Sequence, residues 1–222
     1  MSSKFVRARP GPHDSVIYTT DDGKEFKYYG GDLSWRTNNP GDLWSGPVSK
    51  RNGEIGRYGH FAVFPDYETG HAALLDSLKT TYWNKGLAEM ITGYAPKNEN
   101  KTNQYLQFLR KKTGVKDNRR IRDFTPREFE KLWRAIEQYE GGHSGKIEEV
   151  QTRAKITKVR KNKRGTIIAY FVDGMGWLSK AQGIELARKG KVDAVVAVSR
   201  AGKPFLRTRP GTPVEIELDH LG

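Results

Sequence analysis

The chain has 222 residues, which is enough for one large or two small domains. Hydrophobic residues make up 36% of it and aromatic residues 11%, so a core can form, while a mean hydropathy of -0.75 predicts a strongly polar surface. The absence of cysteine excludes disulfides, thiolate zinc sites and cysteine nucleophiles. No apolar run reaches the length of a membrane span, and residues 1–30 lack the apolar segment of a signal peptide. We therefore expect a protein that is made in the cytoplasm without a cleaved signal and has no membrane span.

The positive charge of the chain is uneven. The formal net charge is +13, and residues 151–222 contribute +9 of it, through 15 Lys and Arg against 6 Asp and Glu. Residues 1–150 hold the other 24 basic and 20 acidic residues, a net of +4. A compact basic unit favours a polyanionic partner, and nucleic acid, an anionic wall polymer or the acidic face of another protein all qualify. A basic surface that serves only solubility is the alternative.

The periodicity of apolar residues changes near residue 150. Before that point it is mostly helical, with a short strand ahead of the first of four predicted helices, at residues 70–82, 87–94, 102–113 and 125–140. After that point it is mostly that of strands, and a ββαββ order is expected, at residues 154–159, 166–172, 178–189, 194–198 and 204–207. The sequence therefore predicts an α+β protein with a mainly helical domain over 1–150 and a small ββαββ domain over 151–222.

The C-terminal domain has its own apolar set, so we expect it to fold alone. The residues expected in its core are Ile156, Ile167, Phe171, Trp177, Ile184, Leu186, Val196, Val198 and Leu206. Its strands are expected to expose Lys and Arg but few aromatic residues.

The carboxylate of Glu140 falls on the apolar side of the best-defined predicted helix. Thr125 and Glu128 supply an N-cap and a capping-box acid, and two glycines end the helix. At about 100° per residue, Glu140 lies about 20° from Phe129, in the middle of the apolar stripe. Burial there disfavours the charged form, so we expect a raised pKa, as a general acid for glycoside cleavage requires. Glu137 is expected at the polar edge, and a frayed helix end with a solvated Glu140 is the alternative.

Residues 36–105 hold the most specific sequence of the chain. A polar turn at 36–43 precedes a short strand, and a Tyr- and Asn-rich connection at 91–105 joins two helices. Aromatic faces stack on sugar rings and amides bind hydroxyl or N-acetyl groups, so a groove lined by these side chains suits carbohydrate. Each piece alone also has an ordinary interpretation as turn chemistry or core aromatics.

Together, three short motifs resemble those of bacterial wall-cleaving glucosaminidases of the flagellar type and of phage virion proteins with lysozyme-like domains. The motifs are Asn-Asn-Pro-Gly-Asp-Leu at 38–43, Phe-Ala-Val-Phe-Pro-Asp at 61–66 and Gly-Tyr-Ala-Pro at 93–96. The resemblance implies a lysozyme-like, peptidoglycan-cleaving domain within residues 1–150. Carried over by motif, Tyr94 matches the active-site Tyr of the glucosaminidases, and Asn38 and Asn39 match their Asn-Asn loop.

The chain departs from this family at the catalytic acid. The glucosaminidases carry a catalytic Glu before the Asn-Asn loop, whereas no Glu stands in a suitable helix before Asn38. The segment Tyr-Glu-Gly-Gly at 139–142 instead resembles the catalytic Glu motif of lysozyme-like enzymes. This implies a circular permutation that moves the opening helix to the end of the domain, which is reasonable because domain termini often lie close together. Glu140 must then face Tyr94 and the loop 38–42 across one groove.

The resemblance implies a set of site residues. Glu140 is the general acid and Tyr94 supports the developing charge, while the expected sugar-binding residues are Arg36, Asn38, Asn39, Asp42, Tyr58 and Glu99. The sequence does not identify the second carboxylate of a glycosidase: Asp42 and Glu99 are the candidates, and both are more often solvated loop acids. If neither faces Glu140, this residue serves first as acid and then as base, as in lytic transglycosylases.

The tail resembles a second family, a small bacterial domain of unknown function. The matching segments are Ile-Thr-Lys-Val-Arg at 156–160, Gly-Trp-Leu-Ser-Lys-Ala at 176–181 and Pro-Phe-Leu-Arg-Thr-Arg-Pro at 204–210. This resemblance covers nearly all of 153–222 and implies a fold but no activity.

Other chemistries have little support in the sequence. His60, His71 and His143 are not in a metal-binding spacing, Ser-His-Asp catalysis lacks a nucleophile elbow, and no phosphate-binding glycine loop follows a strand. We therefore expect no metal or cofactor.

The expected function is that of a muramidase, glucosaminidase or lytic transglycosylase acting on peptidoglycan at the cell wall or in the periplasm. It would reach the wall by lysis, in a phage particle or through a contractile injection machine, so a virion or injection-machine component and an immunity protein are candidate partners. The alternative is a non-catalytic basic module that binds nucleic acid or wall polyanions.

Overall fold

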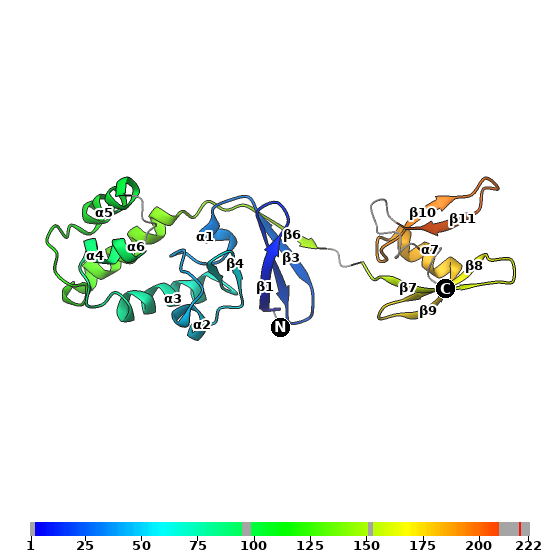
Figure 1. Cartoon of the computed structure of the whole chain (residues 1–222), viewed down its shortest axis with the longest axis horizontal. Coiled ribbons are helices and arrows are strands. Elements are labelled where there is room, and N and C mark those ends of the chain that lie inside the picture. The colour runs from blue at the N-terminus through cyan, green and yellow to red at the C-terminus, as the bar shows by residue number, and fades with distance from the viewer. Residues whose placement is uncertain (1–2, 95–98, 151–152, 209–217, 219–222) are drawn as a thin grey trace. The chain divides into compact units, whose positions relative to one another are not determined.

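The computed structural model describes residues 3–94, 99–150, 153–208 and 218 of the chain. The chain folds into two compact units, residues 1–150 and 151–222, each with its own hydrophobic core (Figure 1). Within the described ranges, no helix has both the length and the apolar character needed to cross a membrane.

The N-terminal unit opens with an antiparallel sheet of order β1-β2-β3-β6. Its strands are β1 (Phe5–Gly11), β2 (Ser15–Thr20), β3 (Glu25–Tyr29) and β6 (Lys146–Val150). Left-handed backbone makes the tight turns between the first three strands: His13 and Asp14 have φ of 52° and 51°, and Gly23 has a φ of 85°. β2 is buried along its whole length, with Val16 and Tyr18 in the core.

A body of short helices lies between β3 and β6 in the sequence. Its elements are α1 (Leu33–Arg36), α2 (Pro47–Arg51), β4 (Gly56–Tyr58), β5 (Phe61–Val63), α3 (Tyr67–Thr80), α4 (Leu87–Tyr94), α5 (Glu99–Thr113), the 3-10 helix η1 (Ile121–Asp123) and α6 (Pro126–Glu140). Helices α3 to α6 share one apolar core, in which Leu78, Ile91 and Ile136 are fully buried. α6 begins after Thr125 because Thr125 and Glu128 form the predicted capping box.

The expectation of a mainly helical domain over residues 1–150 is wrong. The N-terminal region is rich in strands, because the helices share the unit with the four-stranded sheet and the β4–β5 hairpin. Over the described part of the chain the fold is mixed, with seven α-helices and eleven strands in four small sheets. Residues 5–29 contain β-branched and aromatic runs separated by turn residues, which is a strand pattern. The prediction of a mainly helical domain relies on the helical periodicity of later segments and misses these strands.

β6 closes the helical body onto the sheet. Tyr28 pairs with Ile147 and Tyr29 with Lys146, so the chain leaves the sheet after β3 and returns beside it. The departing and returning segments are in contact, since a Cβ built on Gly31 would lie 2.5 Å from the backbone nitrogen of Gly145. The helical body is thus an insertion whose two ends are held together by the β3–β6 pair.

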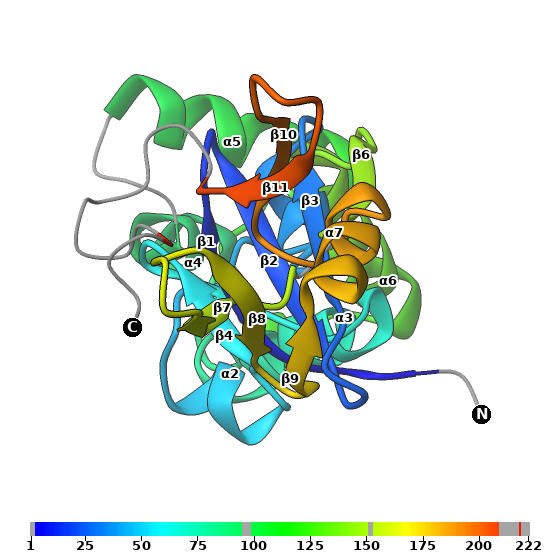
Figure 2. The same ribbon diagram turned by 90° about the vertical axis from the view of Figure 1, so that its right-hand side faces the viewer.

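The C-terminal unit has one helix between two sheets (Figure 1 and Figure 2). Its elements are β7 (Ile156–Lys161), β8 (Ile167–Val172), β9 (Gly176–Ser179), α7 (Lys180–Arg188), β10 (Val195–Val198) and β11 (Pro204–Arg207). The expected ββαββ order therefore lacks β9, a short strand that runs directly into the N-cap Ser179 of α7. The expected core is also wrong in part, because Trp177 is 43% and Val198 66% exposed, while Tyr170 and Val172 are buried.

Candidate active site

Glu140 ends helix α6 with its carboxyl group largely buried. Its Oε1 accepts a hydrogen bond of 2.7 Å from the Tyr105 hydroxyl of α5, and its backbone carbonyl accepts one of 3.4 Å from Ser34. Desolvation raises the pKa of Glu140, and the Tyr105 hydrogen bond opposes that shift because it stabilises the carboxylate. The predicted burial of this carboxyl and the predicted direction of its pKa shift are confirmed.

Asp32 fixes the end of α6. Its Oδ2 accepts hydrogen bonds from the backbone N–H of Gly142 at 2.8 Å and of His143 at 2.9 Å, and the Nδ1 of His143 lies 2.8 Å away. These bonds lower the pKa of Asp32 to about 2. Gly141 has a φ of 113°, and a Cβ there would lie 2.5 Å from the Asp32 carboxylate. The helix therefore stops directly after Glu140. Because Asp32 fixes this helix end, the end does not fray and the Glu140 carboxyl is held in place.

The predicted sugar-binding loop at 38–42 is stabilised by hydrogen bonds of its own side chains. Asn38 and Asp42 have left-handed backbone, with φ of 50° and 43°, which Asn and Asp tolerate better than most residues. Asn39 is fully buried, donating to the carbonyls of Leu43 and Ala62 at 2.9 and 3.0 Å and accepting from the Leu43 N–H at 3.0 Å. Both amide hydrogens of Asn39 are used in these bonds, so Asn39 holds the loop and has no donor left for a sugar. The Asn38 amide also donates to a backbone carbonyl, at 3.2 Å.

Asp42 supplies a second carboxyl, which is close enough to Glu140 for the charge of Glu140 to affect its pKa. Burial is the main cause that raises the pKa of Asp42 to about 8; the charges of Glu140 and Asp32 raise it further, and Arg36 lowers it. Its Oδ1 is buried and has no hydrogen-bond partner within the described residues. The charge of Glu140 is one cause of this shift, and with a pKa of about 8 Asp42 keeps its proton at neutral pH. The pair therefore holds a proton at neutral pH.

Tyr94 belongs to the same cluster. Its hydroxyl donates a hydrogen bond to the carbonyl of Gly41, the residue before Asp42. Desolvation raises the pKa of Tyr94 well above its usual range, and the charges of Glu140 and Asp42 add to the shift. The structure thus brings Glu140, Tyr94 and the loop 38–42 together. The hydroxyl proton of Tyr94 is used in the hydrogen bond to the loop backbone.

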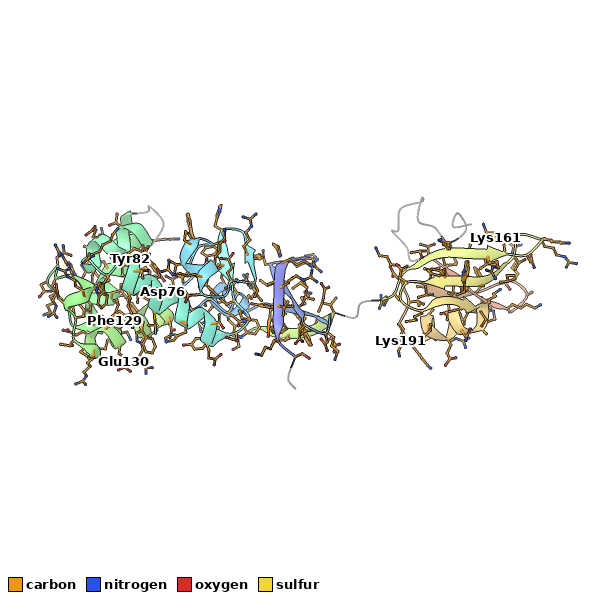
Figure 3. All side chains as sticks on the ribbon, turned by 90° about the horizontal axis from the view of Figure 1, so that it is seen from below. Asp76, Tyr82, Phe129, Glu130, Lys161 and Lys191 are labelled. Atoms are coloured by element: carbon orange, nitrogen blue, oxygen red, sulfur yellow. The ribbon has the colours of Figure 1, made fainter. Side chains whose placement is uncertain are left out.

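A cavity of about 630 Å³ opens beside Asp42 and Tyr94. It is lined by residues 42–49 and 92–94, together with Ser77 and Tyr82, the latter labelled in Figure 3. Trp44 is 67% exposed at this cavity and stacks on His60, with ring centroids 5.4 Å apart. Neither Trp44 nor Tyr82 is predicted as a site residue from the sequence, although Trp44 directly follows the motif at 38–43. Aromatic walls beside a few polar groups suit a small ligand with both apolar faces and hydroxyls, such as a sugar ring.

Arg36 and Tyr58, two of the other predicted sugar-binding residues, contact groups other than the two carboxyls. Arg36 donates to the carbonyl of Gly31 at 3.1 Å, and its guanidinium carbon lies 5.9 Å from the ring centroid of Tyr58. The Tyr58 hydroxyl donates to Asp14 at 3.0 Å. Tyr58 is thus linked to the cluster only through Arg36, whose charge acts on Asp42. The side chain of Glu99, and residues 95–98 with the end of the Gly-Tyr-Ala-Pro motif, lie outside the described residues.

Glu137, which is expected at the polar edge of α6, is partly buried and bonded to polar side chains. Its Oε1 lies 2.7 Å from His71 Nδ1 and accepts a hydrogen bond of 3.1 Å from the Tyr67 hydroxyl, and its side chain is only 16% exposed. Together with Arg134, Glu137 and Tyr67 line a second cavity, of about 380 Å³. Glu130, which is 51% exposed and pairs with Arg134 at 2.9 Å, is the better matched control on this helix. No three His, Asp or Glu side chains are grouped to hold a metal ion in the described part of the chain.

Comparison with known proteins informs only the C-terminal unit. No curated protein and no solved structure gives a significant match to the chain. The one family match lies outside residues 30–145, so the resemblance of that region to lysozyme-like enzymes stays a prediction. The predicted resemblance of the tail to a family without an assigned function is confirmed, because residues 155–222 match the family described as "Protein of unknown function (DUF3892)".

Proposed function

We propose that residues 1–150 cleave the glycan strand of peptidoglycan, with Glu140 and Asp42 as the catalytic carboxyl pair. The observation that carries this proposal is the pair itself: two desolvated carboxyls that hold a proton at neutral pH, of which Asp42 lines a cavity with aromatic walls and Glu140 does not. Glycoside cleavage needs one carboxylic acid to protonate the leaving oxygen and one carboxylate to act as base or nucleophile. Such an enzyme acts at the cell wall, which it reaches by lysis, in a phage particle or through an injection machine.

The electrostatics of the pair change the expected division of roles. The sequence resemblance implies Glu140 as the general acid, whereas in the free protein Asp42 is the carboxyl whose pKa of about 8 keeps it protonated at neutral pH. This favours Asp42 as the acid and Glu140 as the carboxylate, which Tyr105 holds by its hydrogen bond. Tyr94 positions the loop through Gly41, and Trp44 offers an exposed ring face for a sugar to stack on.

Zymography on purified peptidoglycan tests the proposal. Glu140→Gln and Asp42→Asn are each expected to abolish the clearing band, since a general acid or base contributes roughly 10²–10⁴-fold. Glu130→Gln removes an exposed carboxylate from the same helix and should clear like the wild type. Near wild-type clearing by a folded Glu140→Gln protein would refute the proposal.

Aryl glycosides of wall fragments separate the two roles. A nitrophenolate leaves with little protonation, so a variant that lacks only the general acid regains activity on such a substrate, whereas a variant that lacks the base or nucleophile does not. Rescue of Asp42→Asn but not of Glu140→Gln would assign the acid to Asp42, and the reverse result would return it to Glu140. Mass spectrometry of the wall fragments then distinguishes hydrolysed ends from anhydro ends.

A further inference from the structure

The three-stranded sheet of the C-terminal unit carries aromatic and basic side chains on one face. The register of β7, β8 and β9 sets two adjacent rows across the strands: Lys158, Phe171 and Trp177 in one, and Arg160, Ala169 and Ser179 in the next. Side chains alternate along a strand, so these two rows lie on the same face.

The opposite face of the same sheet forms the core. Val159, Tyr170 and Leu178, which alternate with the residues of the two rows, pack in the apolar cluster that includes Ile184 of α7. Helix α7 therefore covers only that inner face, and Trp177 on the outer face stays 43% exposed. This explains why the expected placement of Trp177 in the core is wrong, and it gives the tail an exposed aromatic surface that its sequence did not predict.

The aromatic rings on the outer face lie between cations. Phe171 and Trp177 meet edge to face, with centroids 5.5 Å apart. The guanidinium carbon of Arg160 lies 4.6 Å from the Trp177 ring centroid, and Lys158 Nζ lies 5.8 Å from that of Phe171. A ligand that lies on this face therefore meets flat π surfaces and fixed positive charges within one small area.

We propose that this face, defined by Lys158, Arg160, Phe171 and Trp177, binds single-stranded nucleic acid without sequence preference. Bases of any identity stack on aromatic rings, and cations beside the rings neutralise the phosphates, which is the combination used by sheet-based single-strand binders. The net charge of +9 over residues 151–222 complements a polyanion. A neutral glycan fits less well, because the polar members of the two rows are cations and a serine, without the amides or carboxylates that bind sugar hydroxyls.

Charge alone does not define this site. Figure 3 shows Lys161 and Lys191 well apart on the C-terminal unit, so its lysines are spread over the surface. A test must therefore separate stacking on this face from general attraction to a basic domain.

Fluorescence anisotropy of the full-length protein with a labelled single-stranded oligothymidylate makes this separation. Trp177→Ala is expected to weaken binding about tenfold or more, because one stacked base is worth about 1–3 kcal/mol, while the salt dependence stays unchanged. Trp177→Phe keeps a ring and should retain most of the affinity. Arg160→Ala should reduce the slope of log affinity against log salt by up to about one unit. Lys180→Ala, which removes the same charge from the first residue of α7, outside the two rows, should have a smaller effect than Arg160→Ala.

Several results would overturn the proposal. Wild-type affinity of Trp177→Ala would exclude stacking on this face, and equal losses for Arg160→Ala and Lys180→Ala would reduce the interaction to diffuse charge. The protein could also bind purified sacculi more tightly than the oligonucleotide. If Trp177→Ala then lost only its binding to sacculi, the face would be a wall-binding face instead. Because Trp177 is exposed, an unchanged thermal unfolding temperature of the variants shows that folding is not the cause of any loss.

Discussion

Replacing Asp42 with Asn removes a carboxyl whose ionisation opposes folding. An Asp of the unfolded chain titrates near pH 4, whereas burial, with the charges of Glu140 and Asp32, raises the pKa of Asp42 to about 8 in the folded protein. The stability linked to this raised pKa is fully present below about pH 4 and is lost as the pH rises toward 8, because over this interval only the folded state keeps the proton. At about 1.4 kcal/mol per pKa unit, the loss at pH 7 is at most about 4 kcal/mol. Asn avoids this loss and tolerates the left-handed backbone of position 42.

Thermal unfolding of the wild type and of Asp42→Asn between pH 4 and 8 measures this effect. We expect nearly equal Tm values at pH 4 and a higher Tm for the variant at pH 7, by several degrees, since 1 kcal/mol corresponds to about 2–4 °C in a chain of this size. Glu130→Gln removes an exposed carboxylate and should show no gain that grows with pH. A Tm difference between wild type and Asp42→Asn that is the same at every pH would refute the buried pair, whatever the variant does to wall cleavage.

Four further changes test the surroundings of the pair. Tyr105→Phe removes the hydrogen bond that stabilises the Glu140 carboxylate, so the pKa of Glu140 should rise, the pH–activity profile should move to higher pH, and stability should fall by about 1 kcal/mol; an unchanged profile would argue against this contact. Gly70→Ala places a Cβ 1.9 Å from a carbonyl of the 38–42 loop, so calorimetry should show a loss of about 1–3 kcal/mol or more. Gly93→Ala, whose Cβ would have its nearest neighbour at 3.6 Å, should instead gain up to about 1 kcal/mol. Trp44→Ala removes an exposed ring and should raise KM for soluble wall fragments with little change in Tm, and an unaltered KM would remove Trp44 from the sugar path.

The helix that carries Glu140 could be predicted because its signals are local. Thr125 and Glu128 mark its start, and the apolar stripe determines which side of it is buried, so the predicted helix agrees with α6 to within one residue. The same holds for α7, which is predicted at 178–189 and found at Lys180–Arg188 after the N-cap Ser179. Capping hydrogen bonds and the 3.6-residue period depend only on residues that are close in the sequence. Tertiary contacts do not change the helices that these signals predict.

The N-terminal sheet and the Asp42–Glu140 pair depend on contacts between distant parts of the chain. The hydrogen bond between Tyr29 and Glu148, on the paired strands β3 and β6, joins residues 119 positions apart. Residues 15–20 have the sequence pattern of a strand. That pattern does not reveal which other strand they pair with, and neither does the helical periodicity of later segments. The raised pKa of Asp42 likewise arises from burial and from the charges of Glu140 and Asp32, which are distant in the sequence or outside the loop, so the loop sequence alone suggests a solvated acid.

The pairing of β3 with β6 also determines how the N-terminal unit bears a mechanical load. The chain continues from the end of β6 into residues 151–222, so tension on a tail held by its ligand enters the N-terminal unit at Val150. The backbone hydrogen bonds between β3 and β6 lie between that point and helix α6, and they take up the force before it reaches Gly141. In the proposed enzyme, Glu140 and Asp42 would then keep their spacing while the C-terminal unit is held by its own ligand.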